Sequence, residues 1–395
     1  MKFASQLVGF NACPSDPFRP VATPIYQTAT FEQEHADQFG RYDYSRSGNP
    51  TRTVLEEQLA QLENAQRAFA FASGLAAISS VARLLSVGDE ILACDDLYGG
   101  TYRLFSKILN RTGVKVRYAD ACDLPRFTAA IRPQTRLLYT ETPTNPLLRI
   151  CDIRALADLA HEHGALLCVD NSAMSPYLQN PLDLGADIVV HSATKYLCGH
   201  SDVTAGVAAV RSPELAEQIY FLQNGEGSAL GPFDSYLLLR SIKTLKLRLD
   251  CQQSSAGKIA GHLNAHPAVQ RVYYPGLREH PGYDLHAQQA RGAGAVISFA
   301  TGSFELSKRI AEATRIFRVS VSFGSVNSSI SLPGCMSHAS IPAEVRRGRA
   351  FDADLVRLSI GIEDTDDLID DLTQAFECSG AGEAALAPGA ASSGG

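Results

Sequence analysis

The sequence has no long apolar run and no large excess of charge of one sign. None of its apolar stretches approaches the roughly 20 residues that a membrane-spanning helix needs. The 395 residues carry 35 basic and 42 acidic side chains, a formal net charge of −7, so we expect neither nucleic acid nor a membrane as partner. The start, MKFASQLVGF, lacks the charged head and apolar core of a secretory signal, which favours the cytoplasm.

Cysteine is present, but not in the patterns that bind zinc or form a disulfide framework. There are nine cysteines, an odd number, and no C-x-x-C pair. We therefore expect no metal site and reduced, mostly buried thiols. The phosphate-binding motifs G-x-G-x-x-G and G-x-x-x-x-G-K-[ST] are also missing, so the common signatures of dinucleotide and nucleoside triphosphate sites are excluded.

Strand-like and helix-like segments alternate through the first two-thirds of the chain. Amphipathic stretches such as 51–65 and 152–164 lie between the strand-like runs. Because near-continuous apolar strands that alternate with helices form parallel sheets covered on both faces, we expect an α/β fold with a mostly parallel sheet. The expected strands are 67–73, 90–96, 114–120, 136–143, 165–172, 186–193 and 204–210.

The pattern changes after about residue 235. A single long helical stretch, 235–263, precedes two strand-like runs, AVISFA (295–300) and FRVSVSF (317–323). Further helices are expected at 303–314 and 364–376. This order favours a smaller C-terminal α+β domain that begins with a connecting helix.

A lysine follows the predicted strand ADIVVHSA (186–193). Lys195 precedes a loop of small residues, and the carboxyl ends of strands are where α/β proteins bind ligands. Such a lysine can be an anion partner, a solvated charge or a covalent nucleophile. Other strand ends carry the turn Ser73–Gly74–Leu75, Tyr98 before two glycines, Asn145 between prolines and Asp170 after ALLCV.

Each of these features alone has an ordinary structural explanation. The turn at Gly74 is common in α/β proteins, Tyr98 could fill a core, Asn145 could form a turn and Asp170 could cap a helix. Taken together, a Schiff-base lysine, an aspartate for a protonated ring nitrogen, an aromatic platform and a phosphate cup are what pyridoxal 5′-phosphate needs. We therefore expect Lys195 to anchor that cofactor covalently.

Spaced motifs resemble those of the Cys/Met-metabolism family of pyridoxal-phosphate enzymes. That family includes cystathionine β-lyases, cystathionine γ-lyases, cystathionine γ-synthases and methionine γ-lyases. The resemblance runs from about Pro20 to Phe376, and segments 321–346 and 355–364 look most like plant-type cystathionine β-lyases. The earlier motifs are YSRSGNPTR (44–52), SGLAA (73–77), YGGTYR (98–103), ETPTNP (141–146), VDNS (169–172) and HSATKYLCGHSD (191–202).

The resemblance implies roles for individual residues. Lys195 carries the Schiff base, Tyr98 stacks on the cofactor ring, Asp170 pairs with the ring nitrogen and Asn145 hydrogen-bonds the ring hydroxyl. The phosphate and the substrate carboxylate are each held by a further group of residues. The phosphate contacts are the backbone of Gly74 and Leu75, the hydroxyls of Ser192 and Thr194, and Tyr44 and Arg46 of the neighbouring subunit, whereas Arg357 and Ser322 bind the substrate α-carboxylate.

The resemblance also implies a fold and an assembly. The fold is type I aminotransferase-like, and the assembly is a homotetramer, a dimer of dimers in which sites are shared between subunits. The expected division is an N-terminal arm that contacts the partner subunit (1–45), a pyridoxal-phosphate-binding domain (46–235), the connecting helix with the C-terminal α+β domain (236–377), and a disordered Gly/Ala/Ser-rich tail (378–395).

Three residues favour β-elimination from a small sulfur amino acid, cystathionine. Arg103 matches an arginine that members of the family use for the distal carboxylate of cystathionine. Val321 stands where γ-synthases and γ-lyases usually have Glu, and Gly100 stands where methionine γ-lyases typically have Cys. The resemblance therefore implies a carbon–sulfur lyase of the cystathionine β-lyase type.

Other residues leave alternatives open. Asp43 is shared with γ-synthases, Leu75 replaces a more usual Met, and Asn327 departs from the common Glu or Lys. The alternatives are a cystathionine γ-synthase or γ-lyase, a lyase that acts on cystine or another cysteine conjugate, and a non-catalytic descendant used for binding or regulation.

Overall fold

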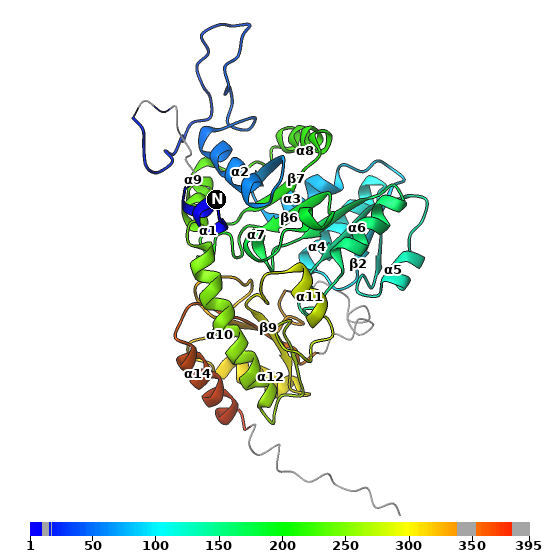
Figure 1. Cartoon of the computed structure of the whole chain (residues 1–395), viewed down its shortest axis with the longest axis vertical. Coiled ribbons are helices and arrows are strands. Elements are labelled where there is room, and N and C mark those ends of the chain that lie inside the picture. The colour runs from blue at the N-terminus through cyan, green and yellow to red at the C-terminus, as the bar shows by residue number, and fades with distance from the viewer. Residues whose placement is uncertain (10–15, 17, 338–352, 381–395) are drawn as a thin grey trace, which may run out of the picture.

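The computed structural model describes residues 1–9, 16, 18–337 and 353–380, which form two β-sheets joined by long helices (Figure 1). The larger sheet has the strand order β1-β7-β6-β5-β4-β2-β3. β7 is antiparallel to its two neighbours, and the strands from β6 to β3 pair in parallel, which confirms the expected mostly parallel sheet. The strands are β1 (Arg67–Phe71), β2 (Glu90–Cys94), β3 (Lys115–Ala119), β4 (Thr135–Glu141), β5 (Leu166–Asp170), β6 (Ile188–Ser192) and β7 (Gly206–Val210).

Helices cover both faces of this sheet. In β1, Phe69 and Phe71 pack in one apolar cluster and Ala68 and Ala70 in another, because alternate residues of a strand point to opposite faces. The second of these clusters includes α2, and the first includes α3, α6 and α8. The helices of this part are α1 (Phe3–Gly9), α2 (Pro50–Leu62), α3 (Gly74–Ala82), α4 (Gly99–Arg103), α5 (Leu124–Ala129), α6 (Ile153–Glu162), α7 (Ser175–Leu178) and α8 (Pro213–Glu226).

Three short helical turns complete the larger part. Directly after α4 the chain forms a π-helical turn and then a 3₁₀ turn, so the helix that begins behind Tyr98 is irregular along its length. These turns are η1 (Leu104–Ile108), η2 (Leu109–Thr112) and, before β6, η3 (Pro181–Leu184).

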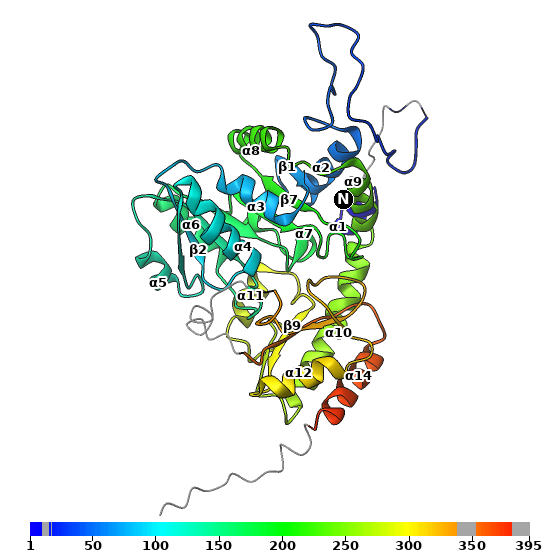
Figure 2. The same ribbon diagram turned by 180° about the vertical axis from the view of Figure 1, so that it is seen from behind.

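The smaller sheet has the order β10-β11-β12-β9-β8 and is antiparallel except between β10 and β11. Figures 1 and 2 show it below the larger sheet, with α12 and α14 beside each other. A large mostly parallel sheet with a smaller α+β part is thus confirmed. Its elements are β8 (Arg271–Tyr273), α11 (Tyr283–Gln289), β9 (Val296–Ala300), α12 (Phe304–Ala313), β10 (Arg318–Val319), β11 (Ser329–Ser331), β12 (Val356–Ser359) and α14 (Thr365–Cys378).

The prediction of one helix over 235–263 is wrong. Two helices, α9 (Pro232–Ile242) and α10 (Leu245–Ala265), lead from the larger to the smaller sheet (Figure 2). Arg248 Nη2 donates to the Ser241 carbonyl at 3.1 Å, and Thr244 N donates to the same oxygen at 3.2 Å. This carbonyl is therefore occupied at the point where a continuous helix would need it for residue 245.

The expected strand over 317–323 is also mostly wrong, since β10 covers only Arg318–Val319. Ser322 has a left-handed backbone (φ 80°), which turns the chain away from an extended path. The strands β8, β11 and β12 were missed because three or four residues are too few to show a clear alternation of apolar and polar side chains. Residues 338–346 of the motif at 321–346 and residues 381–395 of the expected tail lie outside the described residues.

The expectation of mostly buried thiols is wrong for the part of the chain that the structure describes. Cys94, Cys151, Cys168 and Cys198 are buried, and four other described cysteines are exposed because they lie on loops or on outer helix faces. In the same part, no cluster of three or more His, Cys, Asp or Glu side chains is arranged to hold a metal ion. Within the described ranges, no helix combines the length and the apolar character needed to cross a bilayer.

Candidate active site

A cavity of about 430 Å³ lies between the carboxyl ends of the large-sheet strands and the smaller sheet. Its walls come from the ends of β4, β5 and β6, from the loops after β1 and β2, and from β12 and the loop before β11. Eleven of the thirteen residues expected from the sequence line it: Gly74, Leu75, Tyr98, Arg103, Asn145, Asp170, Ser192, Thr194, Lys195, Ser322 and Arg357.

The amine of Lys195 lies inside this cavity. Its Nζ donates to the hydroxyl of Ser322 at 2.5 Å and lies 5.0 Å from the centre of the Phe323 ring. Burial and, to a smaller extent, the positive charge of Arg357 lower the pKa of Lys195 to about 8, although the negative charge of Asp170 opposes both. About half of these amines are therefore uncharged near pH 8, and only the uncharged amine is a nucleophile or a base.

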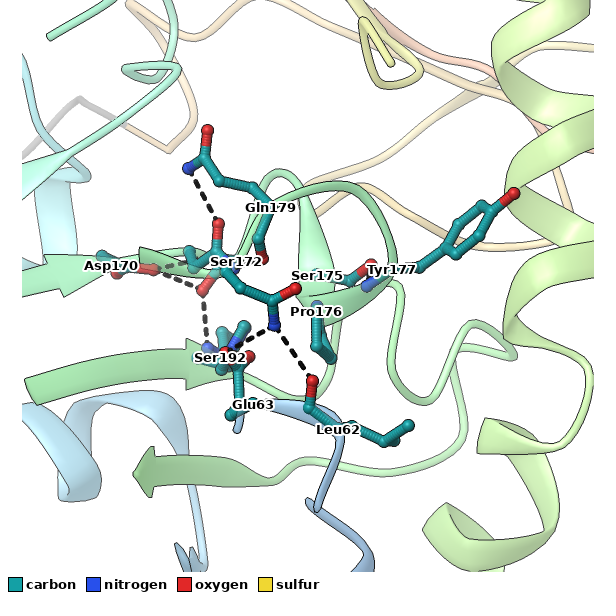
Figure 3. Close-up of polar contacts among 12 residues, drawn as sticks. Leu62, Glu63, Asp170, Ser172, Ser175, Pro176, Tyr177, Gln179 and Ser192 are labelled. Carbon is teal, nitrogen blue, oxygen red and sulfur yellow. Dashed lines mark hydrogen bonds and ion pairs between the residues drawn. The ribbon is translucent and has the colours of Figure 1, made fainter. Parts of the chain in front are cut away.

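Asp170 ends β5, and three donors hold its carboxylate. Oδ1 accepts the Ser172 N–H at 3.0 Å and the Ser172 hydroxyl at 2.5 Å, and Oδ2 accepts the Tyr139 hydroxyl at 3.1 Å. The Ser172 oxygen in turn accepts the Ser192 N–H at 2.6 Å, so one side chain joins the ends of β5 and β6 (Figure 3). The carboxylate is thereby fixed in a buried place, with only 6% of the residue exposed.

Arg357 lies in the middle of β12 and is 2% exposed. Its Nη1 donates to Asn145 Oδ1 at 2.7 Å, and its Nη2 donates to the Ser322 carbonyl at 2.8 Å. Burial lowers the pKa of Arg357 to about 10, so the guanidinium is still charged near pH 7. A fixed planar fork of this kind suits a carboxylate, which can accept two parallel hydrogen bonds.

The start of α3 forms a cradle for an anion. Ser73 caps the helix by accepting the Ala76 N–H at 3.1 Å, and no described residue accepts the N–H groups of Gly74 or Leu75. A Cβ at Gly74 would lie 2.9 Å from Ser192 Cα, so this position needs glycine. Free N–H groups at a helix start, beside the hydroxyls of Ser192 and Thr194, fit a phosphate group.

Tyr98 is positioned by a residue that the sequence analysis missed. The Tyr98 N–H donates to Glu141 Oε2 at 3.1 Å. Burial raises the pKa of Glu141 well above its ordinary value, and the negative charge of Asp170 raises it further. A Cβ at Gly100 would lie 2.3 Å from Tyr98 Cε1, so a side chain at residue 100 would displace the aromatic ring from this position. The signal for Glu141 was its place at the end of a predicted buried strand, two residues before a proline.

Two expected cofactor residues lie away from the cavity of their own chain. Neither Tyr44 nor Arg46 lines it, and Arg46 instead donates to Asn224 Oδ1 at 3.2 Å while its guanidinium carbon lies 5.1 Å from the Tyr44 ring centre. Tyr44 is 41% exposed. Arg103 and Val321 do line the cavity, and both are exposed at its mouth.

The residues around the cavity fit the chemical groups of pyridoxal phosphate. An amine of lowered pKa, an ordered carboxylate, an aromatic ring and an anion cradle surround one cavity, and a buried arginine lies at its other end. The family model described as "Cys/Met metabolism PLP-dependent enzyme" matches residues 5–377 of this sequence. The chain belongs to this family.

Relatives within the Cys/Met-metabolism family support the assignment. The chain is 58% identical over 362 residues to the chloroplastic cystathionine β-lyase of Arabidopsis thaliana, across 92% of this chain and 78% of that protein. It is 49% identical over 357 residues to a cystathionine γ-lyase of Bacillus subtilis, across 90% and 94%. The crystal structure of a Lactobacillus plantarum cystathionine γ-lyase complexed with L-serine matches with a TM-score of 0.94 at 43% identity, over 96% and 99% of the two chains.

Membership of the Cys/Met-metabolism family has two consequences. The protein depends on pyridoxal phosphate, as expected from the residues around Lys195, and its class of substrate is a sulfur-containing amino acid. The TM-score of 0.94 also confirms that the α/β architecture is that of this family.

Proposed function

We propose that this protein is a cystathionine β-lyase, which converts cystathionine and water to homocysteine, pyruvate and ammonia. The observation that carries the proposal is that both Arg103 and Val321 lie at the mouth of the cavity that contains Lys195. An arginine there suits the distal carboxylate of cystathionine, and an apolar residue replaces the Glu of γ-specific relatives. The higher identity to the Arabidopsis β-lyase than to the Bacillus γ-lyase supports the same choice.

The roles of the side chains follow from their positions. When bound, pyridoxal phosphate supplies an aldehyde that bonds to an amine and a ring that withdraws electron density from the substrate α-carbon. Arg357 holds the α-carboxylate, and Asp170 keeps a proton on the ring nitrogen through its adjacent negative charge. Lys195 Nζ accepts the proton from the α-carbon, after which a sulfur on Cβ can depart as a thiolate.

The identity of the products tests the proposal directly. Purified protein with cystathionine is expected to release pyruvate, ammonia and homocysteine, with little 2-oxobutanoate, and chromatography of the keto acids distinguishes the two. If the products are mainly 2-oxobutanoate and cysteine, the reaction is γ-elimination and not β-elimination. A purified protein that binds no pyridoxal phosphate would instead support a non-catalytic descendant.

Removing the Arg103 guanidinium is expected to weaken the binding of cystathionine more than the binding of a substrate without a distal carboxylate. Arg103→Ala loses a charged hydrogen bond to the distal carboxylate, worth about 1.5–3 kcal/mol, so KM for cystathionine should rise roughly 10- to 150-fold. KM for a cysteine conjugate without that carboxylate should hardly change, and steady-state kinetics with both substrates measures the difference. Arg111→Ala is the matched control, because Arg111 is an exposed arginine nearby that does not line the cavity. Equal effects on both substrates would show that Arg103 does not bind the distal carboxylate and is only a surface arginine.

We further propose that the protein is a homotetramer in which Tyr44 and Arg46 complete the site of a neighbouring subunit. The position of both residues away from their own cavity, and the exposure of Tyr44, support this arrangement. Phe18 and Val21, in the expected N-terminal arm, are also almost fully exposed in the single chain, as residues that pack on a partner would be.

Mixed subunits are expected to restore activity. If Arg46 serves the partner's site, a heterodimer of Lys195→Ala and Arg46→Ala chains has one site with both lesions and one intact site. Co-refolding the two inactive parents should therefore give up to about half of the wild-type activity per heterodimer. Activity of size-fractionated, differently tagged heterodimers measures this. Heterodimers without activity would place Arg46 in the site of its own chain.

We propose the cytoplasm as the location of this protein, in line with its composition. The Arabidopsis relative is named as a chloroplastic enzyme. Microscopy of the tagged full-length protein in its source cells therefore decides between the cytoplasm and another compartment.

A further inference from the structure

Tyr139 is a fully buried tyrosine whose hydroxyl reaches the candidate site from behind. It lies in β4, is 1% exposed, and packs edge-on against Phe105 with ring centres 5.2 Å apart. β4 and β5 pair in parallel with Glu141 opposite Asp170 and Tyr139 opposite Cys168. Tyr139 and Asp170 are thus close neighbours on adjacent strands, and the phenol donates to Asp170 Oδ2 at 3.1 Å.

The acceptor positions of Asp170 are nearly all occupied. A carboxylate offers about four lone-pair positions, two on each oxygen. Among the described residues, Ser172 fills two positions on Oδ1 through its N–H and its hydroxyl, and Tyr139 fills one on Oδ2. The remaining position is therefore on Oδ2, the oxygen that Tyr139 already holds.

The phenol is also a dependable donor. Burial raises the pKa of Tyr139 well above its ordinary value, and the negative charge of Asp170 raises it further, so the hydroxyl keeps its proton throughout the working range of pH. Without this bond, Ser172 alone would hold the carboxylate, through one oxygen, and Oδ2 could turn about the Cβ–Cγ bond.

We propose that Tyr139 is a positioning residue for the cofactor, because its hydroxyl fixes the one oxygen of Asp170 that can still accept a hydrogen bond from the protonated ring nitrogen. The proposal rests on the proposed role of Asp170 as the partner of that nitrogen. Tyr139 does not line the cavity, so its influence passes through the orientation of the Asp170 carboxylate.

The test compares cofactor binding by two proteins, the single variant Lys195→Ala and the double variant Lys195→Ala with Tyr139→Phe. Lys195→Ala makes the binding noncovalent in both. Tyr139→Phe removes only the oxygen and keeps the ring contact with Phe105. The dissociation constant for pyridoxal phosphate, measured by fluorescence quenching, should rise by at least about tenfold, the lower end of the loss expected for one hydrogen bond to a charged acceptor. The visible circular dichroism band of the bound cofactor should change as well, because the ring is less firmly oriented.

Tyr118→Phe is the matched control. Tyr118 lies on β3, its hydroxyl hydrogen-bonds Ser106 Oγ at 2.8 Å, and its side chain does not line the cavity. Removing this oxygen should leave the dissociation constant and the dichroism band unchanged. Melting temperatures of all cofactor-free variants distinguish loss of fold from loss of binding.

Asp170→Asn and Asp170→Ala separate the proposal from the function on which it rests. If these variants weaken cofactor binding and Tyr139→Phe does not, Tyr139 is core packing only and the proposal is overturned while the site stands. If neither Asp170 variant affects binding, the assignment of Asp170 itself fails. In the double variant with Asp170→Ala, the Tyr139→Phe effect should vanish. A persistent effect would also overturn the proposal.

Discussion

Lys195→Ala is expected to abolish turnover and to leave a folded protein that still binds pyridoxal phosphate without a covalent bond. The Lys195 amine is both the proposed nucleophile and the proposed base, so its loss removes two functions at once. The phosphate cradle at Gly74 and the carboxylate of Asp170 are separate from it and should persist. Turnover of cystathionine, cofactor content after gel filtration and thermal melting measure the three properties.

Lys258→Ala controls for the loss of a lysine as such. Lys258 is an exposed residue of α10 that does not line the cavity, and its replacement should leave kcat and cofactor content unchanged. Near-normal β-elimination by Lys195→Ala, in protein free of host enzyme, would end the assignment of Lys195. Loss of the fold in that variant would show that Lys195 also supports the packing around Phe323.

Arg357→Ala is expected to raise KM for cystathionine by at least about 100-fold. The guanidinium is a buried cation that lines the cavity, and two charged hydrogen bonds to a carboxylate are worth about 3–6 kcal/mol together. Arg357→Lys should recover only part of this loss, because an ammonium lacks the planar fork. Steady-state kinetics, together with the dissociation constant of a non-reactive amino acid, measures the effect.

Arg248→Ala is the matched control for removing a buried arginine. Arg248 is 4% exposed, its pKa is also lowered by burial to about 10, and its Nη1 donates to the Tyr196 carbonyl at 2.8 Å. It does not line the cavity, so its loss should lower the melting temperature without a comparable rise in KM. If Arg357→Ala behaved like Arg248→Ala, Arg357 would be a structural arginine and another residue would bind the carboxylate.

Local patterns were enough to find the residues at strand ends. Lys195 and Asp170 each follow a run of buried β-branched or apolar residues, and parallel strands bring such ends to one edge of the sheet. The seven strands of the large sheet were predicted for the same reason. Arg357 came only from the resemblance to the family, because its side chain reaches the cavity from another sheet and no local pattern shows that.

Residues inside strands and breaks inside helices could not be predicted. Tyr139 looks like an ordinary apolar-facing strand residue, and its importance lies in a hydrogen bond to a neighbouring strand. The break between α9 and α10 depends on Arg248, whose partner Ser241 is revealed only by the folded helix. Pairing of this kind is a property of three-dimensional register, which a single sequence does not contain.

The division of the site between the two sheets has a consequence for how such an enzyme can change. Asp170 ends β5 and Lys195 follows β6 of the large sheet, whereas Arg357 lies in β12 of the small sheet and Ser322 lies in the loop before β11. A substitution in the small sheet can shift the Arg357 guanidinium while the hydrogen bonds that fix Asp170, all made within the large-sheet part, stay in place. Reactivity and substrate choice can therefore diverge along separate lines of descent, and a lineage can acquire a new substrate without first losing its chemistry.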